Sequence, residues 1–188
     1  MKLPRTIRLD PSDAFVFERA AEPGEWAVPG GFASWEEDPA AMPGKRRQAF
    51  RAGFLGLASF GWSTLVAVAE ASAEQREAAR DALAAHLRSA YGAPDAAAAG
   101  AAAEEEIAFA ESLCADHPPG TVLALARDLD ASGAVRERFR TLHRRADAGP
   151  HRNLGALPVF GIVATDEEDA LERPDLTAIA RDGGQAGR

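Results

Sequence analysis

Extended and helical patterns occupy separate blocks of this chain instead of alternating along it. Short runs of β-branched and aromatic residues, bounded by turn formers, fill residues 5–69, helical patterns fill 72–115, and extended patterns return from residue 122. A parallel α/β sheet requires strands and helices to alternate. The block order therefore predicts an α+β fold with a largely antiparallel or mixed sheet and two main helices in the middle of the chain.

The composition is that of a globular protein. Hydrophobic residues make up 46% of the 188 residues and charged residues 27%, so the chain can bury one core of ordinary size. We expect a single α+β domain over residues 1–181. The remaining residues, 182–188, are polar and rich in glycine, and this pattern predicts a disordered tail.

The first block predicts a series of short strands, because β-branched and aromatic residues alternate there between Gly, Pro, Asp and Ser. The runs around the first Pro-Gly-Gly are close enough together to form a meander. The expected strands cover residues 5–9, 14–17, 25–28, 32–35, 49–57 and 62–69.

The middle block predicts two helices. Ser72 and Gln75 have the spacing of a capping box, in which each side chain satisfies a backbone donor at a helix start, and Gly92 suits the end of that helix. Residues 104–115 predict the second helix from their apolar spacing. The alanine-rich residues 93–103 between the two fit either a linker or the first turns of the second helix.

The last block predicts a β-hairpin. Two extended runs, 122–129 and 135–142, flank a polar turn that contains Ser132 and Gly133. A further strand is expected at residues 157–164, followed by an acidic segment at 166–172 and a short helical stretch.

Alternating arginines in the second hairpin strand are the strongest functional lead. Arg136, Arg138 and Arg140 lie on one face of that strand, where planar guanidinium groups could bind a phosphate, a carboxylate or an acidic partner segment. The alternative is a solvated strand face neutralised within the chain by Glu104, Glu105 and Glu106 or by the acidic carboxyl-terminal segment. The candidate ligand-binding residues are Arg136, Arg138, Arg140, His143, Arg144, Arg145, His151 and Arg152.

Aromatic residues concentrate in the first third of the chain. Most are expected in the core, since large rings contribute most to core packing. A minority could line a pocket or an oligomer interface, where a large ring with a polar edge is favoured. The candidates for such a surface are Trp26, Phe32, Trp35 and Trp62.

Cys114 and His117 stand three residues apart, the spacing of a metal-ligand pair or of a nucleophile with its base. A structural zinc site needs four ligands, and the chain holds one cysteine and four scattered histidines. Cys114 also shares the apolar face of its helix, which favours a buried core thiol. The sequence also holds neither a Walker loop nor a dinucleotide fingerprint, and we expect no metal and no cofactor.

The formal net charge of -8 opposes binding to nucleic acid or to anionic membranes, which carry the same sign. No apolar run approaches the length of a signal-peptide core or a membrane span. With a single cysteine, no internal disulfide can form, and we expect the protein in the cytoplasm.

Four stretches of the first block carry a resemblance. Residues 5–13 (RTIRLDPSD), 25–28 (EWAV), 53–56 (GFLG) and 61–65 (GWSTL) resemble a bacterial family of unknown function. The resemblance covers most of the chain and implies no catalytic motif.

Because no catalytic constellation stands out, the leading hypothesis is a non-enzymatic accessory or interaction protein. It would self-associate as a homo-oligomer or bind another protein through the aromatic-rich sheet or the arginine face. The alternative is a binder of a small anionic ligand, or an enzyme acting on one, through residues 136–152. The sequence leaves enzymatic activity open.

Overall fold

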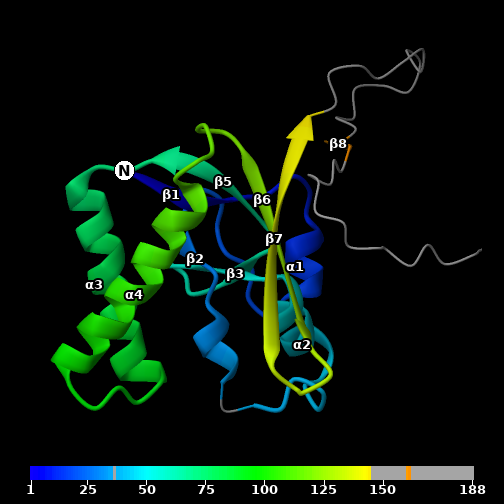
Figure 1. Ribbon diagram of the computed structural model, residues 1–188, viewed down its shortest axis with the longest axis horizontal. Helices are drawn as coiled ribbons and strands as arrows, with labels where there is room; N and C mark the ends of the chain where they lie inside the picture. The colour runs from blue at the N-terminus through cyan, green and yellow to red at the C-terminus, as the bar shows by residue number, and fades with distance from the viewer. Residues whose placement is uncertain (36, 145–159, 162–188) are drawn as a thin grey trace, which may run out of the picture.

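The computed structural model describes residues 1–35, 37–144 and 160–161 (Figure 1). Its helical segments are α1 (Ser12–Val16), the 3-10 helix η1 (Gly31–Ser34), α2 (Gly44–Ala52), α3 (Ala73–Ala90) and α4 (Ala96–Cys114). Its strands are β1 (Lys2–Ile7), β2 (Ala27–Val28), β3 (Phe54–Gly56), β4 (Trp62–Ser63), β5 (Leu65–Glu70), β6 (Val122–Leu129), β7 (Val135–Arg144) and β8 (Phe160–Gly161).

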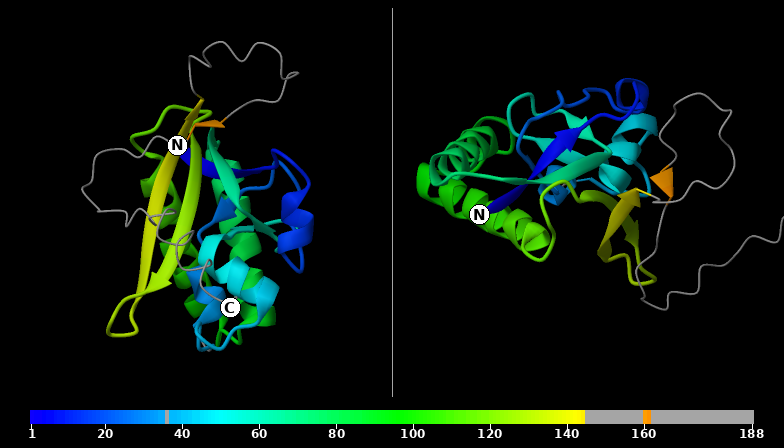
Figure 2. Two further views of the ribbon diagram at one scale, coloured as in Figure 1. Left: turned by 90° about the vertical axis from the view of Figure 1, so that its right-hand side faces the viewer. Right: turned by 90° about the horizontal axis from the view of Figure 1, so that it is seen from above.

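The strands form two antiparallel sheets. The larger has the order β1-β5-β6-β7-β8 and the smaller the order β2-β3-β4. The helices occur beside sheets whose strand pairs are antiparallel, not in parallel βαβ units, and the expected α+β class is confirmed. Figures 1 and 2 show α3 and α4 side by side, next to β1 and away from the tip of the β6–β7 hairpin.

The two central helices are confirmed. The Ser72 hydroxyl accepts a hydrogen bond from the backbone of Gln75, and the Gln75 side chain accepts one from the backbone of Ser72. The second helix starts at Ala96, where Asp95 caps it, so most of the alanine-rich stretch is helix and not linker. In the described residues, neither these helices nor the shorter ones combine the length and apolarity that a membrane crossing requires.

The β6–β7 hairpin is also confirmed, with the register Leu129↔Val135 next to the turn. One oxygen of Asp130 accepts hydrogen bonds from the backbone of Ser132 at 2.8 Å and of Ala134 at 3.0 Å. Gly133 adopts the left-handed conformation that the turn needs, with φ +83°.

Three expected strands are wrong. Residues 14–16 belong to α1 and Phe17 directly follows it; Phe17 is buried in the core, whereas Phe15 is 72% exposed. Residues 32–35 form η1 and the residue after it, because Gly30 at φ +70° breaks the extended backbone after Pro29.

The third error concerns residues 49–57, which contain the end of α2 and the short strand β3. The helix α2 was missed because its first turns consist of the polar residues 45–48, which precede the apolar run. Only Ala49 and Phe50 of that helix are buried, so its pattern resembles a strand when read alone.

The core consists of two clusters of buried side chains. One joins η1 and β3 to the facing sides of α3 and α4, and includes Phe32, Leu83 and Ile107. The other joins β5 and β6 to the smaller sheet and to Cys114 at the end of α4. The first cluster brings η1 against the helix pair, and this contact builds the site described below.

Candidate functional site

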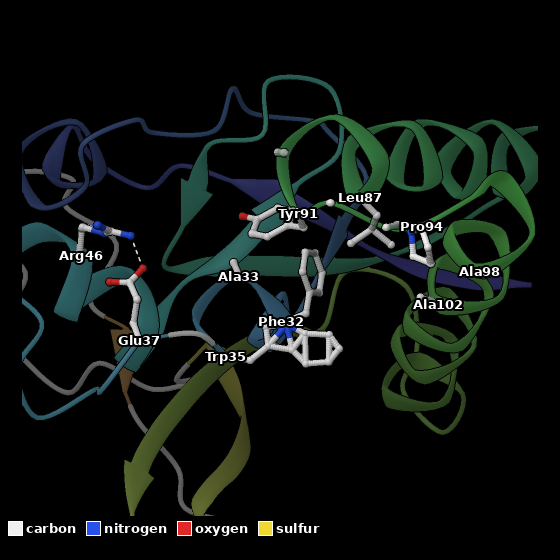
Figure 3. Close-up of a pocket in the computed structure, with 13 residues that line it drawn as sticks. Phe32, Ala33, Trp35, Glu37, Arg46, Leu87, Tyr91, Pro94, Ala98 and Ala102 are labelled. Atoms are coloured by element: carbon white, nitrogen blue, oxygen red, sulfur yellow. Dashed lines mark hydrogen bonds and ion pairs between the residues drawn. The ribbon is translucent and has the colours of Figure 1, made fainter.

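An open cleft of about 1250 Å³ lies between η1 and the turn that joins α3 to α4 (Figure 3). The Arg46–Glu37 ion pair stands at one end, and Pro94, Ala98 and Ala102 stand at the other. Between these ends the side chains are aromatic or aliphatic. The cleft therefore offers an apolar surface with one polar end.

Three aromatic side chains form the middle of the cleft. Phe32 is buried and packs edge-on against Tyr91, with 5.3 Å between the ring centroids and 86° between the ring planes. Trp35 follows at the end of η1 and is 76% exposed. A tryptophan this exposed leaves most of its apolar area in water, so it is the largest contact that the cleft can offer to a binding partner.

A second layer of rings supports Tyr91 from behind. His86 of α3 meets Tyr91 edge-on at 5.4 Å and stacks on Phe60 at 3.6 Å, with 8° between the two planes. Burial, and then the charge of Arg19, lowers the pKa of His86, so its ring favours the neutral form. Phe60 has φ +52°, a left-handed backbone that is strained for a residue with a side chain. This backbone conformation places the Phe60 ring on His86.

The polar end of the cleft is nearly neutral. Arg46 of α2 pairs with Glu37, and Figure 3 shows the Tyr91 hydroxyl directed toward this pair. Burial raises the pKa of Tyr91, while the charges of Arg46 and Glu37 act on it in opposite directions. A smaller cavity of about 130 Å³ adjoins the same residues and reaches Trp62.

Glycines and one buried arginine fix η1 in this place. A Cβ on Gly30 would stand 2.8 Å from the Cβ of Leu55, so the close packing needs glycine there. Arg127 of β6 is 2% exposed and donates to the carbonyls of Pro29, Phe50 and Gly53 and to Glu137. One guanidinium thus ties the start of η1 to the end of α2 and to the hairpin.

Sequence reasoning missed Arg127. The signal was present, because residues 123, 125 and 127 of β6 alternate onto one face and the first two are leucines. An arginine that continues the apolar face of a strand either marks the point where that face reaches solvent or is buried with hydrogen-bond partners for its guanidinium. The structure shows the second case.

Glu106 of α4 lies beside this arginine. Burial, and then the charge of Glu137, raises the pKa of Glu106, while Arg127 and the Gly30 backbone N–H lower it. Its Oε2 is buried and has no hydrogen-bond partner within the described residues. The site behind η1 therefore holds two carboxylates and one guanidinium.

The candidate arginines lie elsewhere. Arg136, Arg138 and Arg140 are exposed on one face of β7, as the alternation predicts. Arg138 pairs with Asp128, and Arg136 pairs with Asp130 at 3.4 Å. Aspartates of β6 and its turn thus provide counter-charges, which had been expected from residues 104–106 or from the acidic carboxyl-terminal segment.

The structure describes only two of the other five candidate ligand-binding residues. His143 and Arg144 belong to β7, while Arg145, His151 and Arg152 lie outside the described residues, as does most of the strand expected at 157–164. The acidic segment 166–172, the helical stretch after it and the tail 182–188 lie outside them too.

The four aromatic candidates separate in space. Phe32 and Trp35 line the cleft, and Trp62 lines the smaller cavity next to it. Trp26 belongs to neither and packs under the guanidinium of Arg5, 5.2 Å from the ring centroid. Tyr91 and Leu87, which sequence reasoning had not selected, complete the cleft.

Cys114 is fully buried, and burial raises the pKa of its thiol to about 11. This agrees with a core cysteine. Over residues 1–35 and 37–144 and the pair 160–161, the His, Cys, Asp and Glu side chains form no group of three that could hold a metal ion.

A family model matches residues 1–152, and its description is "Family of unknown function (DUF6505)". The resemblance to a family of unknown function is thus confirmed. No curated protein matches the chain. No solved structure matches it either.

Proposed function

The chain belongs to this family of unknown function, and we propose that it is a non-enzymatic interaction protein that binds apolar side chains of a protein partner in the cleft beside η1. The single observation behind this proposal is the 76% exposure of Trp35 on an open apolar cleft. Exposed tryptophans beside a preformed hollow are characteristic centres of protein–protein interfaces.

The rest of the cleft supports contact with an apolar surface. Ala98 and Ala102 stand one helical turn apart on α4 and keep that wall low, so a bulky side chain could reach Phe32 at the floor. The Arg46–Glu37 pair supplies one donor and one acceptor group at the rim. An apolar centre with a polar edge is the usual anatomy of an interface.

The ionisable groups of the lining suit binding more than chemistry. They are Glu37, Arg46 and Tyr91. Glu37 and Arg46 neutralise one another, and burial raises the pKa of the tyrosine hydroxyl, which therefore remains protonated at neutral pH. This supports the choice of a binding role over catalysis.

The first prediction concerns Trp35. Partners captured by the wild-type chain from a lysate of its source should be lost with Trp35→Ala, and the purified partner should bind at least about tenfold more weakly, since a central tryptophan carries a large share of interface energy. Isothermal calorimetry measures the second effect. The matched control is Phe15→Ala, which truncates an equally exposed ring on α1 outside the cleft.

If Phe15→Ala lost the partner to the same extent, the binding would be non-specific hydrophobic adsorption. If Trp35→Ala bound the partner as tightly as the wild type, the cleft would not be the binding site. Circular dichroism of both variants shows whether either one unfolds. Because both side chains are largely exposed in the wild type, neither truncation leaves a core cavity.

Self-association and a cytoplasmic location are part of the same proposal. Sedimentation of the wild type and of Trp35→Ala distinguishes a second copy of the chain from a different protein as the partner. The cytoplasm is supported by a single cysteine that is buried as a free thiol.

A further inference from the structure

The Arg46–Glu37 ion pair belongs to two hollows at once. It stands at the polar end of the cleft of about 1250 Å³, and it also lines the smaller cavity of about 130 Å³. Tyr91 lines both hollows as well. In Figure 3 the ion pair stands on one side of Tyr91, and Leu87 and Pro94 stand on the other. A ligand with its apolar part in the cleft would therefore meet the ion pair with its polar end.

The charged groups around the ion pair balance one another. The described residues that line the smaller cavity include two carboxylates, Glu18 and Glu37, and two cations, Lys45 and Arg46. A ligand with one charge would be attracted by half of these groups and repelled by the other half. A ligand that carries both an ammonium and a carboxylate would find a group of opposite sign for each of them.

The ion pair also keeps hydrogen-bonding capacity for such a ligand. It joins Nη2 of Arg46 to Oε1 of Glu37, and the two side chains are 52% and 28% exposed. A guanidinium has five N–H donors and a carboxylate has two acceptor oxygens, so this contact leaves most of both unused within the described residues. In the same part of the chain, the Lys45 ammonium donates to the Phe17 carbonyl at 3.4 Å and to no carboxylate. Both signs are thus available to a ligand.

The spacing of the two charges limits what the ligand can be. Because Arg46 and Glu37 are in direct contact, the ammonium and the carboxylate of the ligand must also be neighbours to reach both. An α-amino acid carries the two groups on one carbon, whereas the two ends of a peptide are separated by its backbone. The side chain would then extend toward Phe32. An aromatic side chain suits this place, since Phe32 and Tyr91 already pack edge-on there.

We propose that the cleft binds a free apolar α-amino acid, with its carboxylate at Arg46, its ammonium at Glu37 and its side chain over Phe32 beside Trp35. This site does not depend on a protein partner, because the amino acid is a complete ligand by itself. It also gives the cleft a means of control. Trp35 would contact either the amino acid or a protein partner, and the two would exclude one another.

Isothermal titration calorimetry of the purified chain with four probes tests this proposal. L-phenylalanine carries both charges and a ring, 3-phenylpropionate lacks the ammonium, 2-phenylethylamine lacks the carboxylate, and L-alanine lacks the ring. The protein should bind L-phenylalanine at least about tenfold more tightly than each other probe, since a hydrogen bond to a charged group, or the burial of a ring, contributes that much. These four titrations use the wild type, so they do not depend on the folding of a variant.

Two substitutions assign the charges of the ligand to residues. Arg46→Gln should reduce the affinity for L-phenylalanine to that for 2-phenylethylamine, and Glu37→Gln should reduce it to that for 3-phenylpropionate. Arg80→Gln is the control, because Arg80 of α3 is also ion-paired but lines neither hollow. It should leave the affinity for L-phenylalanine unchanged.

Equal affinity for L-phenylalanine and for either single-charge probe would overturn the proposal, as would equal affinity for L-alanine. So would the absence of binding heat with all four probes at millimolar concentration. An unchanged affinity in both glutamine variants would place the amino acid elsewhere on the protein and would overturn the proposal too. The protein-partner proposal fails separately, when Trp35→Ala retains the captured partner.

Discussion

Arg127 and Glu106 show how single residues hold the cleft in shape. Arg127 is buried, and its donors are used by three backbone carbonyls and by Glu137. Replacing Arg127 would cost more stability than its hydrogen bonds contribute on balance, because each of the three buried carbonyls would lose its partner. Glu106 is the opposite case, a second carboxylate beside the same guanidinium with one oxygen unpartnered in the described part of the chain.

At this scale we predict a stability that depends on pH through Glu106. The pKa of Glu106 is raised above its ordinary value of 4.5, so the folded protein holds this proton more tightly than the unfolded chain does. Stability from this group is therefore complete below pH 4.5 and is lost as pH rises through the folded pKa. Glu106→Gln should raise Tm at pH 8, and the gain should shrink toward zero at pH 4, as followed by circular dichroism.

Glu105→Gln is the control for this experiment, because the neighbouring side chain is exposed on the same helix. The charge of Glu105 is the smallest of the causes that raise the pKa of Glu106, so Glu105→Gln should raise Tm at pH 8 by much less than Glu106→Gln does. A loss of stability with Glu106→Gln that is equal at pH 4 and pH 8 would contradict the assignment of a charge penalty to this carboxylate.

Among the elements, those with a local signal were predictable from sequence. The capping box at Ser72 and the turn at Gly133 each contain their own hydrogen-bond partners, so helix α3 and the β6–β7 hairpin follow from a few neighbouring residues. The segments η1 and α2 could not be predicted from neighbouring residues. Their conformation depends on contacts distant in sequence, such as the hydrogen bonds from Arg127 to the carbonyls of Pro29 and Phe50. The cleft is built from those segments, and so its geometry was outside the reach of pattern alone.

For α3 we predict that Ser72→Ala lowers the free energy of unfolding by about 1 kcal/mol, the usual cost of removing a capping hydroxyl. The hydroxyl accepts the Gln75 backbone N–H at 3.2 Å, and alanine leaves that donor to water. Ser112→Ala in the last turn of α4 is the control, since the Ser112 hydroxyl donates back to the Phe109 carbonyl and caps no helix start. Urea unfolding should show the first loss and a change near zero, or a small gain, for the control.

At the scale of the fold, the two sheets and helix α4 meet at Cys114. Its cluster contains Ala27 and Phe54 of the smaller sheet together with Val66 and Leu123 of the larger one. Opening any of these contacts to solvent requires the separation of elements that otherwise share this cluster. The exposure of this thiol therefore reports on the integrity of the entire arrangement.

We accordingly predict that Cys114 reacts with a thiol reagent at pH 8 only through opening of the fold. The thiol is 0% exposed and has a pKa of about 11, so both access and thiolate content are low in the native state. Its labelling rate, measured by mass spectrometry, should rise steeply with sub-denaturing urea. In Ala101→Cys, an exposed position of α4 in the same molecule, labelling should be fast and nearly independent of urea. Similar rates at the two positions would mean that α4 detaches from the sheets without unfolding the rest, and that the cleft it lines opens with it.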